Sequence, residues 1–157
     1  MITIQIDTRE HTGQVERIED QFDSLGVKHF RSKLYVGDYQ SLDNPRLVVD
    51  RKKDLQEIAG NVCQQHERFR AELIRAQEAG IQIVILCEHG GQIRSLEDVF
   101  FWDNPRRRTS KGAISGQRLF KILSTMKDKY GVRFEFCDKR QTGRRIVEIL
   151  TNDKRGD

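Results

Sequence analysis

The chain has 157 residues, of which 36% are hydrophobic and 33% charged, and its formal net charge is +4. This length is enough for one hydrophobic core and predicts a single domain over residues 1–157. No apolar run approaches the ~20 residues that span a bilayer, and the amino terminus MITIQIDTRE has neither a basic start nor a cleavable signal pattern. These features exclude a membrane-spanning class and predict a cytoplasmic protein with no membrane partner.

The first half of the chain alternates between strand and helix patterns. The expected elements are a strand at 2–6, a helix at 14–25, strand-like segments at about 27–34 and 35–42, and a strand that begins at Leu47. Apolar residues at helical spacing follow in two stretches, Leu55, Ile58, Ala59 and Val62, then Phe69, Leu73 and Ala76, and Gly80 ends the second.

The second half repeats this alternation around one long polar segment. A strand is expected at 81–88, a polar loop at roughly 89–113, a helix at 114–131, a strand at 132–138 and a helix at 142–151. The last residues, 152–157, are predicted to be disordered. Strands that alternate with helices favour an α/β fold, in which helices cover both sides of a central sheet.

One strand ends in charges. Leu47-Val48-Val49 is an apolar run, yet it continues directly into Asp50, Arg51 and Lys52. Buried charges are costly unless they are paired or bind a metal. Because side chains alternate along a strand, Asp50 and Lys52 are expected on one face and Arg51 on the other.

A second acid is expected beside this strand end. Asp38 follows Gly37 at what the pattern indicates is the end of a strand, and a hairpin through an Asn44-Pro45 turn would bring it next to Asp50. Two carboxylates on neighbouring strands suit a hard cation such as Mg²⁺ or Mn²⁺. A lysine on the same face can orient a water molecule or stabilise charge on a phosphate. The alternative is an ordinary surface ion pair, because Asp-x-Lys is common by chance.

The order of three short motifs resembles the XPF-type structure-specific endonuclease domain. IDTRE supplies Asp7 and Glu10, GDY supplies Asp38, and VVDRK supplies the Asp50-Arg51-Lys52 triplet, each at a strand end. The resemblance implies a restriction-endonuclease-like fold with a mixed central sheet, divalent-metal catalysis, and cleavage of branched or flapped DNA. It implies that Asp38 and Asp50 hold the metal, that Glu10 helps directly or through water, and that Lys52 serves the nucleophile. Asp7 and Arg51 complete the expected catalytic set.

The chain departs from this family at three points. Asp50 stands where the family has a glutamate, and Gln56 stands where it often has an aspartate, with Asp54 and Glu57 as candidates to substitute. The tandem helix-hairpin-helix module that usually follows the nuclease domain is not in this sequence. A stand-alone domain of this size suggests a bacterial, phage or mobile-element origin, and an accessory subunit or a homodimer would supply further DNA contacts.

The charge of the chain is divided unevenly. Residues 1–103 hold 13 Lys and Arg against 18 Asp and Glu, a net of −5, whereas residues 104–157 hold 15 against 6, a net of +9. A basic, aromatic loop at about 100–112 contains FFWDNPRRRTSKG, in which Arg106, Arg107, Arg108 and Lys111 are candidate phosphate contacts. An exposed aromatic there could stack on an unpaired base, or Phe100, Phe101 and Trp102 could pack as core.

Arg144 and Arg145 are further candidates, near the start of the last helix, where the helix dipole does not favour cations. The histidines, at 11, 29, 66 and 89, and the three cysteines, at 63, 87 and 137, show no metal-ligand spacing. The sequence therefore predicts a metal-dependent DNA endonuclease. The alternatives are a non-catalytic protein of the same fold that binds branched DNA, and a homodimeric Holliday-junction resolvase.

Overall fold

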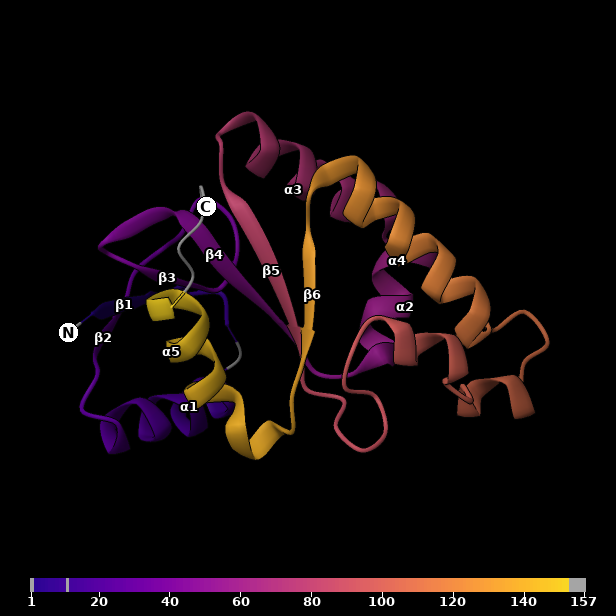
Figure 1. Ribbon diagram of the computed structural model, residues 1–157, viewed down its shortest axis with the longest axis horizontal. Helices are drawn as coiled ribbons and strands as arrows, with labels where there is room; N and C mark the ends of the chain where they lie inside the picture. Colours follow the sequence, from indigo (N-terminus) through magenta and orange to yellow (C-terminus); the bar gives the residue numbers. More distant parts are fainter. Residues whose placement is uncertain (1, 11, 153–157) are drawn as a thin grey trace.

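The computed structural model describes residues 2–10 and 12–152, and its centre is one mixed sheet of six strands (Figure 1). The strand order is β2-β1-β3-β4-β5-β6. The strands are β1 (Thr3–Ile6), β2 (Lys28–Arg31), β3 (Tyr39–Ser41), β4 (Asn44–Lys52), β5 (Gln82–Cys87) and β6 (Arg133–Phe136). Strand β3 is antiparallel to both of its neighbours, whereas β4, β5 and β6 run parallel, so their carboxyl ends meet at one edge of the sheet.

Helices cover both faces of the sheet, as predicted. Figure 1 shows α1 (Thr12–Ser24) and α5 (Thr142–Asn152) on one side of the strands. On the other side lie α2 (Leu55–Cys63), α3 (His66–Glu78) and α4 (Gly116–Tyr130). Three short 3₁₀ helices complete the chain: η1 (Glu97–Phe101), η2 (Pro105–Arg108) and η3 (Lys139–Gln141). Each face has its own hydrophobic core, which confirms the α/β class with a mixed central sheet.

The helices form where spacing and capping agree. In α1, the buried Val15, Ile18 and Phe22 recur at the period of one helix face. Helix α4 is capped at its start by Ser115, whose side chain accepts a hydrogen bond from Arg118 N, and at its end by Gly131, whose φ of 71° is left-handed. These local signals explain why the predicted helices are close to the observed ones.

The loop predicted at 89–113 contains the two short helices η1 and η2, and most of its apolar side chains are covered. Val99 and Trp102 are buried, and Trp102 packs edge-on against His89. Phe100 contacts Phe120 of α4. The core interpretation of the aromatic cluster therefore holds for all but Phe101, which is 80% exposed.

Three boundary predictions are wrong. Strand β3 begins after Asp38 rather than ending at it, because Gly37, with a φ of 76°, interrupts the extended backbone just before Asp38. The hairpin turn lies at Leu42 and Asp43, and Asn44 already pairs with Ser41. The predicted strand at 27–34 is only four residues long. Of the tail predicted to be disordered, Asn152 belongs to α5, and residues 153–157 lie outside the described residues, as does His11.

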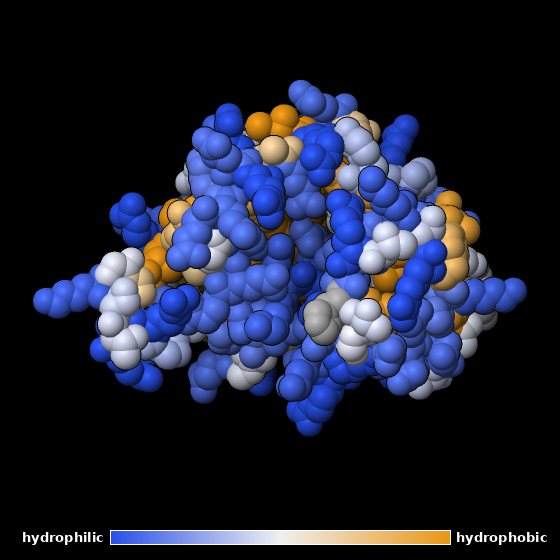
Figure 2. All heavy atoms as spheres, turned by 180° about the vertical axis from the view of Figure 1, so that it is seen from behind, coloured by the Kyte–Doolittle hydropathy of each residue, from blue (hydrophilic) through white to orange (hydrophobic). Residues whose placement is uncertain are grey.

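Polar side chains dominate the surface seen from behind, and the hydrophobic ones are gathered there in small separate patches (Figure 2). Within the described ranges, no helix is both long and apolar enough to pass through a bilayer. The apolar residues are largely taken up by the two cores, which leaves the charged strand ends as the feature that packing alone does not explain.

Candidate active site at the strand ends

A close approach of two strands places Asp38 beside Asp50. Gly37 has a φ of 76°, and a Cβ atom at this position would lie 2.8 Å from the Cγ2 of Val48. Only glycine fits both the left-handed backbone and this spacing. The carboxylate of Asp38 then accepts a hydrogen bond of 2.8 Å from the backbone N–H of Arg51, the residue after Asp50. Gly37 therefore allows the close approach that brings Asp38 next to Asp50.

The two carboxylates lie in a buried site where acidic groups crowd together. Burial raises the pKa of Asp38 well above its ordinary value, and the neighbouring carboxylates of Asp50 and Glu10 raise it further. The Nζ atom of Lys52 lies 3.9 Å from Asp50 Oδ2 and 5.5 Å from the centre of the Phe69 ring. Burial alone would lower the pKa of Lys52, but the surrounding acids, led by Asp50, outweigh it and raise that pKa. Lys52 therefore remains a cation in a buried site.

Glu72 of α3 is a third acid on this side, and the sequence analysis missed it. Its Oε2 lies 3.5 Å from the backbone nitrogen of Gly37. Burial raises the pKa of Glu72, and the nearby Asp50 adds to that rise. The available signal was its spacing from Phe69, three residues earlier in the same helix, but only the packing of α3 on the sheet shows that this face reaches Asp50.

Arg51 points to the opposite face of β4, as the alternation of side chains predicts. Its Nε lies 2.8 Å from Glu10 Oε2, and its Nη1 lies 2.7 Å from Glu88 Oε1. The hydroxyl of Tyr39 also donates to Glu10, at 2.8 Å. No twist turns Arg51 towards Asp50. Glu10 thus lies between Arg51 and Tyr39, close enough to raise the pKa of Asp38 but already engaged by two donors.

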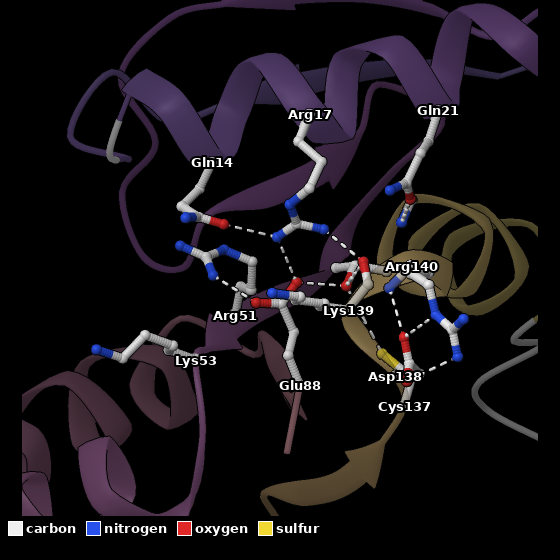
Figure 3. A network of polar contacts seen from close by, with 12 residues as sticks. Gln14, Arg17, Gln21, Arg51, Lys53, Glu88, Cys137, Asp138, Lys139 and Arg140 are labelled. Carbon is white, nitrogen blue, oxygen red and sulfur yellow. Dashed lines mark hydrogen bonds and ion pairs between the residues drawn. The ribbon is translucent and has the colours of Figure 1, made fainter. Parts of the chain in front are cut away.

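Glu88 organises the polar network on that opposite face (Figure 3). Its other oxygen, Oε2, accepts from Arg17 Nη2 of α1 at 2.8 Å and from the hydroxyl of Thr142, the first residue of α5. Arg17 also donates to the backbone oxygen of Lys139, at 2.5 Å. The network ties the ends of β4 and β5 to both helices of this layer. Sequence reasoning missed Glu88, although it follows the most apolar strand just as Asp50 follows the run before it.

Asp7 is a paired acid rather than a free one. It accepts from Arg9 Nε at 2.7 Å and from the backbone N–H of Leu34 at 2.7 Å. Burial would raise the pKa of Asp7, but these hydrogen bonds outweigh it and hold that pKa below its ordinary value. Asp7 therefore anchors the segment that leads to Gly37 and Asp38.

The candidates for the missing family aspartate have other partners. The side chain of Asp54 caps α2 by accepting from Glu57 N at 2.9 Å, and Glu57 accepts from Lys53 N at 2.7 Å. Gln56 donates to the side chain of Asn104, at 2.5 Å. These three contacts are structural, and Glu72 is the acid that approaches Asp50 from the helical layer.

The basic candidates fall into two groups. Arg106, Arg107, Arg108 and Lys111 are all exposed, with Arg108 3.3 Å from Asp103, in an ion pair that is itself exposed. On α5, Arg144 is exposed, whereas Arg145 is partly buried between Glu135 and Glu148. The structure therefore separates available cations from Arg145, whose charge is compensated.

Metal-binding capacity rests on two acids rather than on a complete cluster. Within residues 2–10 and 12–152, no group of three or more His, Cys, Asp or Glu side chains is arranged to hold a metal ion. Asp38 and Asp50 nevertheless offer oxygen ligands, the donors that a hard divalent cation prefers, and the raised pKa of Asp38 marks a place where positive charge is lacking. The chemistry of these donors fits Mg²⁺ or Mn²⁺.

One protein family and two solved structures are similar to this chain. Residues 6–149 match the ERCC4 domain family. A solved structure of XPF from Aeropyrum pernix is 22% identical, with a TM-score of 0.68 over 98% of this chain and 65% of that one. A second, XPF from the same organism in complex with DNA, is 20% identical, with a TM-score of 0.66 over 96% of this chain and 64% of that one.

This chain thus spans slightly less than two thirds of those solved chains. At these identities the likeness shows the fold, and it confirms the restriction-endonuclease-like α/β class. No curated protein matches this chain in sequence.

Proposed function

This chain belongs to the ERCC4 domain family, and from that premise we propose that it is a divalent-metal-dependent endonuclease that hydrolyses phosphodiester bonds in branched or flapped DNA. The observation that carries the proposal is the meeting of Asp38 and Asp50 at one edge of the sheet, with Lys52 3.9 Å from Asp50 on the same face. The DNA-bound XPF from A. pernix supports DNA as the class of substrate.

The acids and the lysine have separate roles in this proposal. Asp38 and Asp50 would hold the cation, which would polarise the scissile phosphate and make a neighbouring water more acidic. Lys52 orients the attacking water and offsets the charge that builds on the phosphate oxygens. Because the acids around Lys52 raise its pKa, it acts as a fixed positive charge and a hydrogen-bond donor rather than as a base.

Glu10 and Arg51 support the site from the other face of β4. Glu10 holds Arg51 at 2.8 Å while it lies near Asp38. We propose that this pair fixes the strand end and that Glu10 reaches the cation through water. Asp7 positions the segment before Asp38 through Leu34. A direct catalytic role for Arg51 remains a prediction from the resemblance.

The exposed cations supply the DNA-binding surface. We propose that Arg106, Arg107, Arg108, Lys111 and Arg144 contact phosphates, because all five are exposed. Arg145 is expected to contribute less, since Glu135 and Glu148 already compensate its charge. Pairing of two copies, or an accessory subunit, would extend this surface. The cytoplasmic location, the bacterial or mobile-element origin and the single-domain organisation remain predictions.

A labelled substrate panel tests the proposal. Single strand, duplex, 3′ flap, 5′ flap, fork and four-way junction are incubated with Mg²⁺, Mn²⁺ or EDTA. We expect cutting near the branch that requires the metal and disappears in Lys52→Ala. Lys53→Ala is the matched control, because Lys53 is the exposed neighbour of the buried Lys52.

The outcomes separate the alternatives. A Lys52→Ala protein that cuts at the normal rate contradicts the assignment of the site. Branched-DNA binding without cutting in any metal favours the non-catalytic binding protein. Paired symmetric cuts confined to the four-way junction favour the Holliday-junction resolvase.

A further inference from the structure

Tyr35 is an exposed aromatic residue beside the acidic site. The residue is 61% exposed, and the guanidinium carbon of Arg75 lies 5.4 Å from the centre of its ring. Its chain neighbours Leu34 and Val36 are both buried. This ring therefore has a cation against it and remains largely open to solvent.

The segment that carries Tyr35 is fixed at both ends. The N–H of Leu34 donates to Asp7 at 2.7 Å, and Arg9 donates to the oxygen of Leu34 at 3.1 Å. Farther along, the N–H of Gly37 faces Glu72. A ring held in this way loses little conformational entropy when a ligand stacks on it.

The Tyr35 ring lies near the proposed cation site. Tyr35 is three residues before Asp38, a reach of roughly 10 Å along an extended chain. Arg75 is three residues after Glu72 on α3, so both lie on the same side of that helix. The Tyr35–Arg75 pair therefore flanks the acids that are proposed to hold the cation at the scissile phosphate.

We propose that Tyr35 and Arg75 form a stacking platform for an unpaired nucleobase of the strand that is cut, close to the scissile phosphate. This inference rests on the proposed nuclease function and deepens it, because it explains how the protein would distinguish a flap from a duplex. Every base has a π-face, so stacking on Tyr35 tolerates any sequence, whereas a base inside a duplex is already stacked. Arg75 supplies the positive charge for the adjoining phosphate.

The test uses a flap that carries 2-aminopurine, whose fluorescence falls when the base stacks, next to the branch. Binding is followed in EDTA, so that no cutting occurs. We expect fluorescence to fall on binding to the unaltered protein and to Tyr35→Phe, but not to Tyr35→Ala. Affinity of Tyr35→Ala for the flap should fall about tenfold, with little change for duplex. Phe30→Ala, at an exposed aromatic on edge strand β2, is the matched control.

Arg75→Gln gives an independent readout. If Arg75 contacts a phosphate of the single strand, the slope of log affinity against log salt should fall by about 0.7. An unchanged slope would remove Arg75 from the platform.

The results separate this inference from the nuclease assignment. Equal quenching and flap affinity in Tyr35→Ala and the unaltered protein overturn the platform, and so does quenching that depends on Phe101 instead. Cutting that persists without Tyr35-dependent quenching leaves the nuclease standing and the platform refuted. Tyr35-dependent quenching without any cutting supports the platform and refutes the nuclease.

Discussion

Charged side chains are closely paired on one face of strand β4 and not on the other, although the residues that carry them are consecutive. On the α1 and α5 side, Arg51 and Arg17 meet Glu10 and Glu88 at distances of 2.7–2.8 Å. On the α2 and α3 side, the three acids Asp38, Asp50 and Glu72 lie close together, and the cation nearest to Asp50, Lys52, is 3.9 Å away. We call these the paired face and the acidic face. The difference is what the proposal rests on: the paired face stabilises the fold, and the acidic face is the proposed cation site.

The physical cost of the acidic face supports this division. Two carboxylates that approach each other away from water raise each other's energy unless a proton or a cation lies between them. Folding alone gives no reason to keep such a pair. Groups with strongly perturbed pKa values cluster at functional sites for this reason.

The largest expected effect is on the acidic face. Asp50→Asn should reduce cleavage at least about 1000-fold, equivalent to about 4 kcal/mol of transition-state stabilisation, because it removes one of the two proposed cation ligands. Single-turnover cleavage of the best branched substrate measures it. Asp43→Asn, in the exposed β3–β4 turn, is the control. Normal cleavage by Asp50→Asn would show that the acidic face has no catalytic role.

The next effect is on the paired face. Glu88→Ala should destabilise the protein by about 3 kcal/mol, a fall of roughly 6–12 °C in Tm, because it leaves the buried Arg51 with one partner fewer and releases Arg17. Thermal unfolding measures it, and Glu16→Ala at an exposed position of α1 is the control. Equal Tm values for the two variants would show that this network does not stabilise the protein.

Asp7 gives a pH test of a paired acid. Asp7→Asn should cost about 2 kcal/mol at pH 7, since hydrogen bonds to a charged group are lost. The folded pKa of Asp7 lies below its ordinary value of 3.8, so its stabilisation is present above about pH 4 and is lost as the pH falls through the folded pKa. The difference in unfolding free energy should therefore shrink in acid. A difference in unfolding free energy that does not change with pH would contradict this account.

Asp38 should behave in the opposite way. Its folded pKa is raised, so the unfolded chain ionises first and stability falls as the pH rises above 3.8 through the folded pKa. In EDTA at pH 7, Asp38→Asn should gain about 1 kcal/mol, or roughly 2–4 °C in Tm, while losing cleavage. Mg²⁺ should raise the Tm of the unaltered protein but not that of the variant. Destabilisation in EDTA would overturn the contrast between the two faces.

The smallest effect extends the contrast to the two neighbouring arginines of α5. Arg144→Ala should weaken duplex binding by about 0.5 kcal/mol and lower the salt slope by about 0.9, as expected for one lost phosphate contact. Arg145→Ala should leave that slope unchanged because two glutamates already hold its charge. Salt-dependent binding in EDTA compares them. Equal slopes for the two variants would mean that pairing does not decide which cation meets DNA.

The errors in the sequence analysis arise where contacts between distant parts of the chain outweigh a local pattern. The turn expected at Asn44-Pro45 lies at Leu42 and Asp43, since the register shifts between Gln40 and Ser41 and brings Asn44 into pairing. Asn-Pro is a turn signal by local chemistry, yet cross-strand pairing outweighed it. The aromatic cluster divides similarly, because Trp102 packs into the core and against His89 whereas Phe101 is exposed.

The sequence by itself determined the features that depend on short-range periodicity. The alternation of β4 placed Asp50 and Lys52 together and Arg51 opposite, and helical spacing identified the buried faces of α2 and α3. Only the tertiary structure decided which distant groups meet these residues. Glu88 reaches Arg51 across neighbouring strands, and Glu72 reaches Asp50 from a helix packed on the sheet. Such contacts depend on strand register and helix packing, which are summed over the whole core and leave no local signal in the chain.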